Sequence, residues 1–176
     1  MANREALREL QTRLASRLQA ARSEGMSPSW LAVKAGDANC LFPLSQSGEI
    51  FPLTNIQVVP YTSPWFLGVV NLRGALYGIV DLASFMGDRL SRSRGEQSLA
   101  DSSVITFNLA LELNCALLVD GLAGLRKRDA FTVAVAPPDG SPSYFGNLFT
   151  DLNGVQWQEI NLQTLSQLSE FLSISA

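Results

Sequence analysis

The stretch GVVNLRGALYGIVDL, residues 68–82, consists of two apolar runs around a short polar turn. Arg73 and Asp81 are the only charged residues among its fifteen. Gly74 follows the arginine and supplies the positive φ that a tight hairpin turn requires. The stretch therefore predicts an apolar β-hairpin that presents a guanidinium at its tip, on a rigid scaffold.

Similar short runs continue on both sides of this hairpin, separated by Gly, Pro, Asp and Asn. They include WLAVKAG, NCLFPL, EIFPL, SVITFNLAL, CALLVDGLAGL and FTVAVAP. Their length and their content of Val, Ile and Phe predict an all-β core, with a barrel or a sandwich preferred. Several runs are apolar at consecutive positions, which indicates strands that are covered on both faces. We therefore expect two β-units packed against each other.

A weak internal repeat is consistent with two related units. LRGALYGIVDL (72–82) aligns with LNGVQWQEINL (152–162), with Leu, Gly and Leu at the same offsets. The shared pattern is a turn glycine between two strands, followed by a polar residue before a leucine. Residues 87–103 are polar and lack aromatic side chains, and we interpret them as a long loop between the two halves.

Helices are expected at both ends of the chain. Residues 1–25 predict an amphipathic N-terminal helix, because leucines recur at helical intervals at Leu7, Leu10, Leu14 and Leu18. This helix is either an exposed arm or a docked element, on this domain or on a partner. The C-terminal segment predicts a short amphipathic helix with a similar spacing of Leu162, Leu165, Leu168 and Leu172.

Composition argues against catalysis and against a metal or cofactor site. The 176 residues include no histidine, which removes the commonest general base and the commonest transition-metal ligand. Cys40 and Cys115 stand far apart in apolar surroundings, and we interpret them as free, buried thiols. No phosphate-binding, dinucleotide-binding or calcium-binding motif is present. We therefore expect no enzyme activity, no metal and no cofactor.

Charge and hydropathy argue against two further classes. Hydrophobic residues make up 47% of the chain, but no apolar run is long enough for a transmembrane helix, and the N-terminus does not resemble a signal peptide. The net charge is −3 and no basic patch with interleaved aromatics occurs, so nucleic-acid binding has little support. These features predict a cytoplasmic protein without direct membrane insertion.

Glu49 is the best candidate partner for Arg73. It lies in the apolar segment SGEIF, with no other acid within eleven residues on either side. An exposed ion pair contributes only about 0–1 kcal/mol to stability, so folding alone gives little reason for the arginine. The alternatives are a solvated turn arginine and a role in recognition, and the enrichment of arginine at interface hot spots favours recognition.

At these residues the chain resembles the CheW-like adaptor domain of bacterial chemosensory systems. The matching segments are FPLSQSGEI, VVPYTSPWFLGVVNLRG and GIVDL, followed by CALLVDGLAGLR (115–126) and the weaker GNLFTDLNGVQWQEINL (146–162). GVVNLRG is the most specific of these segments. The resemblance places a CheW-like domain at residues 30–175.

The resemblance implies two pseudo-symmetric, five-stranded SH3-like barrels that are interleaved on a shared core. It also implies a non-catalytic adaptor that couples a transmembrane chemoreceptor to a histidine autokinase at membrane-bound receptor arrays. The family's receptor-binding Glu and Arg fall on Glu49 and Arg73, and Gly68, Asn71 and Gly74 match the same motif. The kinase would bind through its regulatory domain, at residues of this chain that no motif identifies.

Two departures from the family pattern point to one branch. Gly78 and Ile79 stand where the family usually has a proline-containing strand, and the N-terminal helix is longer than in minimal members. Together with VPYTSPWFLGVVNLRG, they make the chain similar to the adaptors of type IV pilus, or twitching-motility, systems. The alternative function is a sensor with an apolar small-ligand site between the barrels, which requires a closed pocket of about 300 Å³ or more.

Overall fold

The computed structural model describes residues 2–23, 29–87 and 101–175, and β-strands hold more of these residues than helices do. The strands are β1 (Ser29–Ala35), β2 (Ala38–Pro43), β3 (Ser47–Pro52), β4 (Phe66–Leu72), β5 (Ala75–Asp81), β6 (Ser103–Phe107), β7 (Cys115–Val119), β8 (Gly121–Lys127), β9 (Phe131–Val135), β10 (Phe145–Asp151) and β11 (Gln156–Ile160). The helices and 3-10 turns are α1 (Ala2–Ser23), α2 (Leu82–Phe85), η2 (Leu109–Leu111), η3 (Arg128–Ala130), α4 (Leu162–Gln167) and α5 (Ser169–Leu172).

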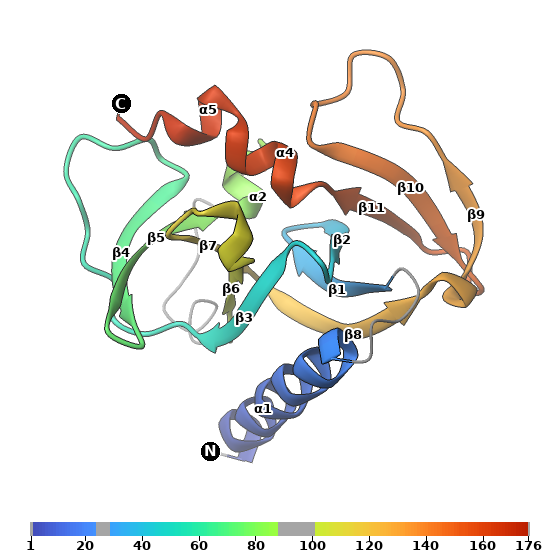
Figure 1. The fold of residues 1–176 in the computed structure, drawn as a ribbon, viewed down its shortest axis with the longest axis horizontal. Helices are drawn as coiled ribbons and strands as arrows, with labels where there is room; N and C mark the ends of the chain where they lie inside the picture. The colour runs from blue at the N-terminus through green and yellow to red at the C-terminus, as the bar shows by residue number, and fades with distance from the viewer. Residues whose placement is uncertain (1, 24–28, 88–100, 176) are drawn as a thin grey trace.

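The strands form two mixed sheets that lie side by side (Figure 1). The six-stranded sheet has the order β8-β1-β2-β11-β10-β9, and the five-stranded sheet has the order β3-β6-β7-β5-β4. The predicted all-β core is therefore confirmed. Most of the predicted loop 87–103 lies outside the described residues.

Two β-hairpins are exchanged between the sheets. The hairpin β1–β2 comes early in the chain but joins the later strands, because β1 pairs with β8 and β2 runs parallel to β11. Reciprocally, β6–β7 pairs with β3 and, in parallel, with β5. The two parallel contacts place Cys40 opposite Gln158 and Cys115 opposite Gly78, so that the cysteines occupy equivalent positions. Neither half of the chain forms its sheet without the other.

The exchanged hairpins explain the consecutive apolar residues of the sequence. All five residues of β6 and all five of β7 are buried. Ile105 and Leu117 belong to a large core that the two sheets share, whereas Val104 and Leu118 pack inside the five-stranded sheet. In the same way, β1 and β2 divide their side chains between the shared core and a cluster around Trp30. The expectation of two packed β-units is confirmed.

The sheets differ from the five-stranded barrels that were expected. One sheet has six strands, and among the described residues no strand pairing joins β8 to β9 or β3 to β4, so neither sheet closes. The sixth strand, β9, pairs with β10, whereas at the equivalent edge β4 has only one bridge, from Val69 to Gln57. Pro52 and Pro60 bracket the segment that makes this bridge. Because proline donates no backbone hydrogen bond, it limits further pairing there.

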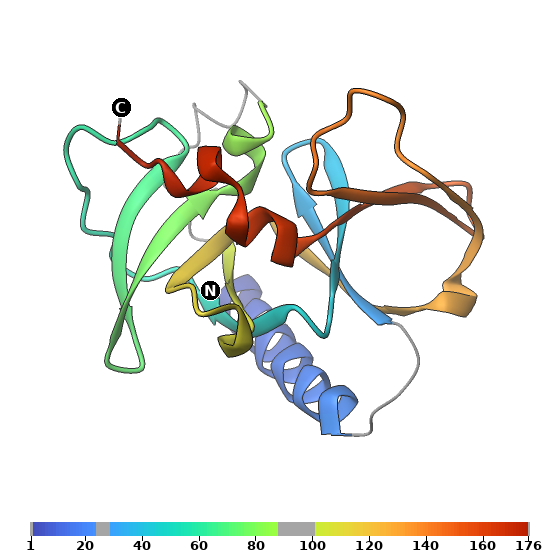
Figure 2. The same cartoon turned by 45° about the horizontal axis from the view of Figure 1, so that its top comes forward.

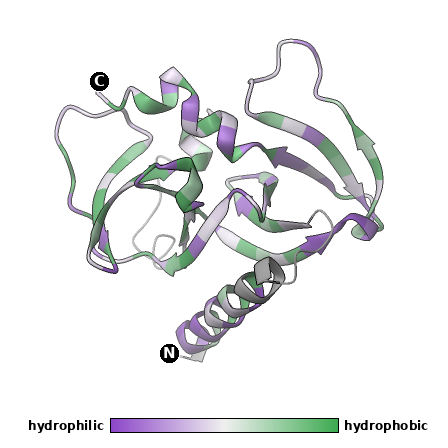
Figure 3. Cartoon of the chain, viewed as in Figure 1, coloured by the Kyte–Doolittle hydropathy of each residue, from purple (hydrophilic) through white to green (hydrophobic). Residues whose placement is uncertain are grey.

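The predicted N-terminal helix is present as α1 and docks on the chain's own sheets. Leu14 and Leu18 are buried in the shared core, where the helix packs against β3 and β8. The side chain of Gln11 donates a hydrogen bond to the hydroxyl of Ser103 at 2.6 Å. Leu10, by contrast, is 41% exposed, and hydrophilic and hydrophobic segments alternate along the helix (Figure 3). Of the alternatives left open by the sequence, the structure therefore shows docking on this domain.

The C-terminal segment forms two short helices where one was expected. The backbone of Leu168 is extended, with a ψ of 123°, which ends α4 and precedes α5. The buried aromatic residue of α5 is consequently Phe171, and Leu172 is half-exposed. Both helices lie over the junction of the two sheets, as the two views of the fold show (Figures 1 and 2). None of the described helices is long and apolar enough to cross a membrane.

The docking of α1 can be tested at two leucines of the helix. Leu18→Ala should lower the free energy of unfolding by about 2–5 kcal/mol, because it leaves a cavity in the shared core. Leu10→Ala, on the exposed side of the same helix, should cost less than about 1 kcal/mol. Urea unfolding measures both changes. Small losses of equal size would show that α1 is not held on the sheets.

Gly68 supports a close approach of the backbone and gives a second test. Its φ is +139°, and a Cβ at this position would meet the carbonyl oxygen of Gln57 and would lie 2.7 Å from Cγ2 of Ile56. Gly68→Ala should therefore lower the free energy of unfolding by about 2–4 kcal/mol. Gly140→Ala is the control, because φ is +86° there but nothing lies within 4 Å, and it should cost about 1–2 kcal/mol. An equal or smaller loss at Gly68 would contradict the close approach.

The two cysteines are free and buried, as the sequence predicts. Burial raises the pKa of the Cys40 thiol and of the Cys115 thiol to about 12. Because the thiolate is the reactive form, neither thiol should react with DTNB in the native protein near pH 8, and both should react in guanidinium chloride. A thiol that reacts in the native protein as fast as in the unfolded chain would have to lie outside the core.

Candidate functional site at the β4–β5 turn

The β4–β5 turn consists of Arg73 and Gly74, between the paired residues Leu72 and Ala75. Both turn residues have a positive φ, of 52° for the arginine and 83° for the glycine, which is the geometry of a type I′ hairpin. The glycine adopts this φ without strain, as predicted, whereas the arginine carries a penalty of about 1–2 kcal/mol. Asn71 completes the turn, because its side-chain oxygen accepts a hydrogen bond from the amide of Gly74 at 2.9 Å.

The structure contains the expected ion pair between Arg73 and Glu49. Nη1 of the arginine lies 3.0 Å from Oε1 of the glutamate, and the two side chains are 74% and 41% exposed. The guanidinium also lies over the ring of Phe51, 5.6 Å from its centroid. An ion pair this exposed adds only about 0–1 kcal/mol to stability. The contacts therefore orient the guanidinium and contribute little to folding.

Glu49 is positioned by a bulge between β3 and β6. The hydroxyl of Thr106 accepts a hydrogen bond from the amide of Glu49 at 2.7 Å, and it donates one to the carbonyl oxygen of Glu49 at 3.4 Å. Gly48 makes room for this hydroxyl, because a Cβ there would meet Oγ1 of Thr106 and would lie 2.6 Å from the carbonyl oxygen of Phe107. Sequence reasoning missed Gly48, although a glycine inside an apolar strand is a signal for a bulge.

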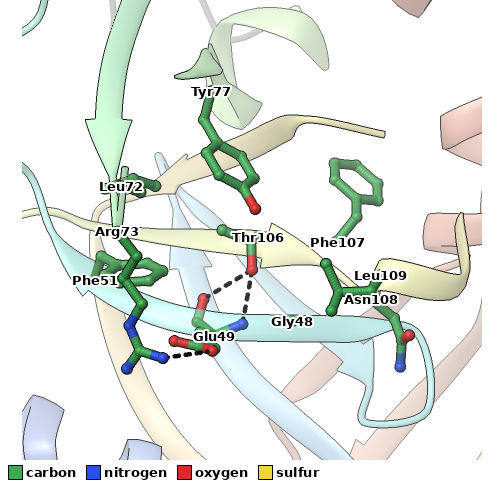
Figure 4. Close-up of a pocket in the computed structure, with 10 residues that line it drawn as sticks. All are labelled: Gly48, Glu49, Phe51, Leu72, Arg73, Tyr77, Thr106, Phe107, Asn108 and Leu109. Carbon is green, nitrogen blue, oxygen red and sulfur yellow. Dashed lines mark hydrogen bonds and ion pairs between the residues drawn. The ribbon is translucent and has the colours of Figure 1, made fainter. Parts of the chain in front are cut away.

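Beside the ion pair the surface is hollowed, with a volume of about 170 Å³ (Figure 4). Five of the ten residues that line the hollow carry large aliphatic or aromatic side chains: Phe51, Leu72, Tyr77, Phe107 and Leu109. Figure 4 shows Arg73 and Glu49 on one side of the hollow and Leu109 on the other. An exposed guanidinium beside an apolar depression is an arrangement typical of protein interfaces.

Leu109 is a further residue that sequence reasoning missed. The apolar run SVITFNLAL suggested a strand through residues 103–111, but β6 ends at Phe107. Asn108 instead caps the turn η2, because its side-chain oxygen accepts a hydrogen bond from the amide of Ala110 at 2.9 Å. Leu109 is thereby left 83% exposed at the hollow. The signal was Asn108 itself, since asparagine favours turns.

The structure brings only part of the predicted site together. Glu49 and Arg73 meet, and Asn71 and Gly74 form the turn that carries the arginine. Gly68 lies next to Gln57 near the other end of β4 and does not line the hollow, so its part in binding stays a prediction. In the part of the chain that the structure describes, no three cysteine or acidic side chains gather in a way that could hold a metal ion.

Comparison with known proteins connects this fold and site to a family. The CheW-like domain matches residues 29–169. Protein PilI of Pseudomonas aeruginosa is 26% identical over 170 residues, which cover 93% of this chain and 89% of that protein. The scaffolding protein TtCheW of Thermoanaerobacter tengcongensis has a similar fold, with a TM-score of 0.62 over 77% of this chain and 89% of that chain, at 18% identity. The match over most of the chain shows that this protein belongs to the CheW-like domain family, a family of non-catalytic scaffold proteins.

Proposed function

We propose that this protein is an adaptor that couples a transmembrane chemoreceptor to the regulatory domain of a histidine autokinase. Membership of the CheW-like family supports a scaffold role in chemosensory signalling. The receptor and the kinase, as the two partners of the scaffold, are the more specific part of the proposal. The proposed location is the cytoplasmic side of membrane-bound receptor arrays. Receptor and kinase must then bind separate surfaces of the chain at the same time.

The observation on which the proposal rests is the strained backbone of Arg73, which has a φ of 52°. Asparagine suits the first position of a type I′ turn better than arginine, and the exposed pair with Glu49 adds little stability. Backbone strain of this kind is concentrated at functional sites. We therefore assign receptor contact to Glu49 and Arg73. Asn71 and Gly74 shape the turn in this assignment, and Gly68 fixes the path of β4.

We further propose that the signalling system is one that controls type IV pilus twitching motility. The similarity to protein PilI supports this, because it covers 93% of the chain and so extends beyond the domain match at residues 29–169. Gly78, one of the departures from the common family pattern, also has a structural reason. A Cβ at Gly78 would lie 2.9 Å from Cε2 of Phe66, so the glycine makes room for that ring.

The rival function, a small-ligand sensor, fits these observations less well. It requires a closed apolar pocket of about 300 Å³ or more between the sheets. The hollow at Arg73 has a volume of about 170 Å³ and belongs to the five-stranded sheet alone. Between the sheets, the described side chains form the shared core.

Arg73→Asn should separate binding from folding. Because asparagine tolerates the left-handed region better than arginine, the variant should keep its free energy of unfolding or gain up to about 1 kcal/mol. Its affinity for the cytoplasmic fragment of a co-encoded chemoreceptor should fall about tenfold or more, because the guanidinium is lost. Urea unfolding and calorimetric titration measure the two quantities.

The matched control is Arg128→Asn, which removes an exposed arginine from the turn η3 beside the six-stranded sheet. This control should bind the receptor fragment with unchanged affinity. Unchanged affinity of Arg73→Asn would reject the assignment of the receptor site.

A further inference from the structure

Leu109 is held rigidly in an exposed position. At 83% it is the most exposed leucine of the described residues. The amide of Asn108 donates a hydrogen bond to the carbonyl oxygen of Gln46 at 2.9 Å, and its side-chain amide donates one to the carbonyl oxygen of Ser45 at 3.1 Å. The turn η2 is therefore tied to the segment before β3. A large apolar side chain that is fixed in water beside an apolar hollow indicates a contact surface.

The hollow beside Leu109 has the size of one large side chain. Its volume of about 170 Å³ is well below the roughly 300 Å³ of small-molecule pockets. It is close to a cavity of about 150 Å³ that accommodates a benzene ring. Phe51 and Tyr77 line it and are only half-buried, so their rings are accessible to a partner.

In the second repeat, a side chain of the protein itself fills the site that corresponds to the hollow. The internal repeat places Trp157 at the position of Tyr77, and the strand pairings place Arg126 at the position of Phe51. The guanidinium of Arg126 lies over the ring of Trp157, 5.8 Å from its centroid, and the tryptophan is only 5% exposed. The second repeat thus covers its aromatic ring with its own arginine, whereas in the first repeat Tyr77 stays partly exposed.

A glycine makes room for this internal side chain. Gly124 stands where the first repeat has Glu49, and a Cβ there would lie 3.2 Å from Nη1 of Arg126. The indole of Trp157 donates a hydrogen bond to Asp151 at 3.0 Å, which fixes the ring. The open hollow of the first repeat is therefore not a general consequence of the fold.

We propose that this hollow binds one large aliphatic or aromatic side chain of the receptor's cytoplasmic segment, with Leu109 and Tyr77 as its walls. The inference rests on the proposed function, since it names the chemistry of the receptor contact. Burial of the apolar side chain supplies affinity, and the Arg73–Glu49 pair at the rim supplies orientation.

The test titrates the full chain and its variants with the purified cytoplasmic fragment of a co-encoded chemoreceptor. Leu109→Ser should weaken binding about tenfold or more, and Leu109→Met, which keeps the apolar volume, should bind within about twofold of the unaltered protein. Leu152→Ser is the control, because Leu152 is 74% exposed in the turn between β10 and β11, on the other sheet. It should also bind within about twofold of the unaltered protein.

The outcomes separate the hollow from the adaptor function. Unchanged binding of Leu109→Ser together with weak binding of Arg73→Asn would overturn the role of the hollow and leave the receptor site in place. Unchanged binding of both variants would overturn the receptor site as well. Equal losses for Leu109→Ser and Leu152→Ser would show non-specific apolar contact and reject the inference. Failure of the unaltered protein to bind any receptor fragment would reject the proposed function, and the inference with it.

Discussion

The two halves of the chain are joined by the reciprocal exchange of the hairpins β1–β2 and β6–β7. Each hairpin gives one face to the shared core and the other face to the interior of the sheet that receives it. The contacts that complete each sheet are consequently long-range, and neither half keeps a complete core by itself. Leu14 and Leu18 of α1 then cover part of the shared core with a helix.

The reciprocal exchange of hairpins makes the strands that hold Arg73 rigid. The strand β6 is buried at every position, and from it Thr106 holds the backbone of Glu49 in the bulge of β3. The strand β5 lies between β7 and β4, so the hairpin that carries the arginine is bound to the centre of its sheet. A rigid support maintains a strained turn, and it reduces the conformational entropy that a partner must remove on binding.

Much of this architecture could be predicted because the sequence patterns that indicate it lie within short segments of the chain. Consecutive apolar residues in CALLV (115–119) indicate a strand covered on both faces, and the isolation of Glu49 and Arg73 among apolar residues indicates their pairing. The missed features depend on contacts between distant segments. The run FTVAVAP predicts the strand β9, but its pairing as a sixth strand of the sheet cannot be derived from spacing along the chain. The same holds for the hydrogen bond from Glu49 to Thr106, 57 residues away.

The two repeats present different side chains at their hairpin turns. Both hairpin turns have a glycine with φ near +80°, at Gly74 and Gly154. The first turn carries an arginine before its glycine, and the second carries Asn153. In the second repeat the arginine is instead Arg126, which lies on a strand over a buried ring. The second turn therefore presents no guanidinium, and a partner that requires one can distinguish the two turns.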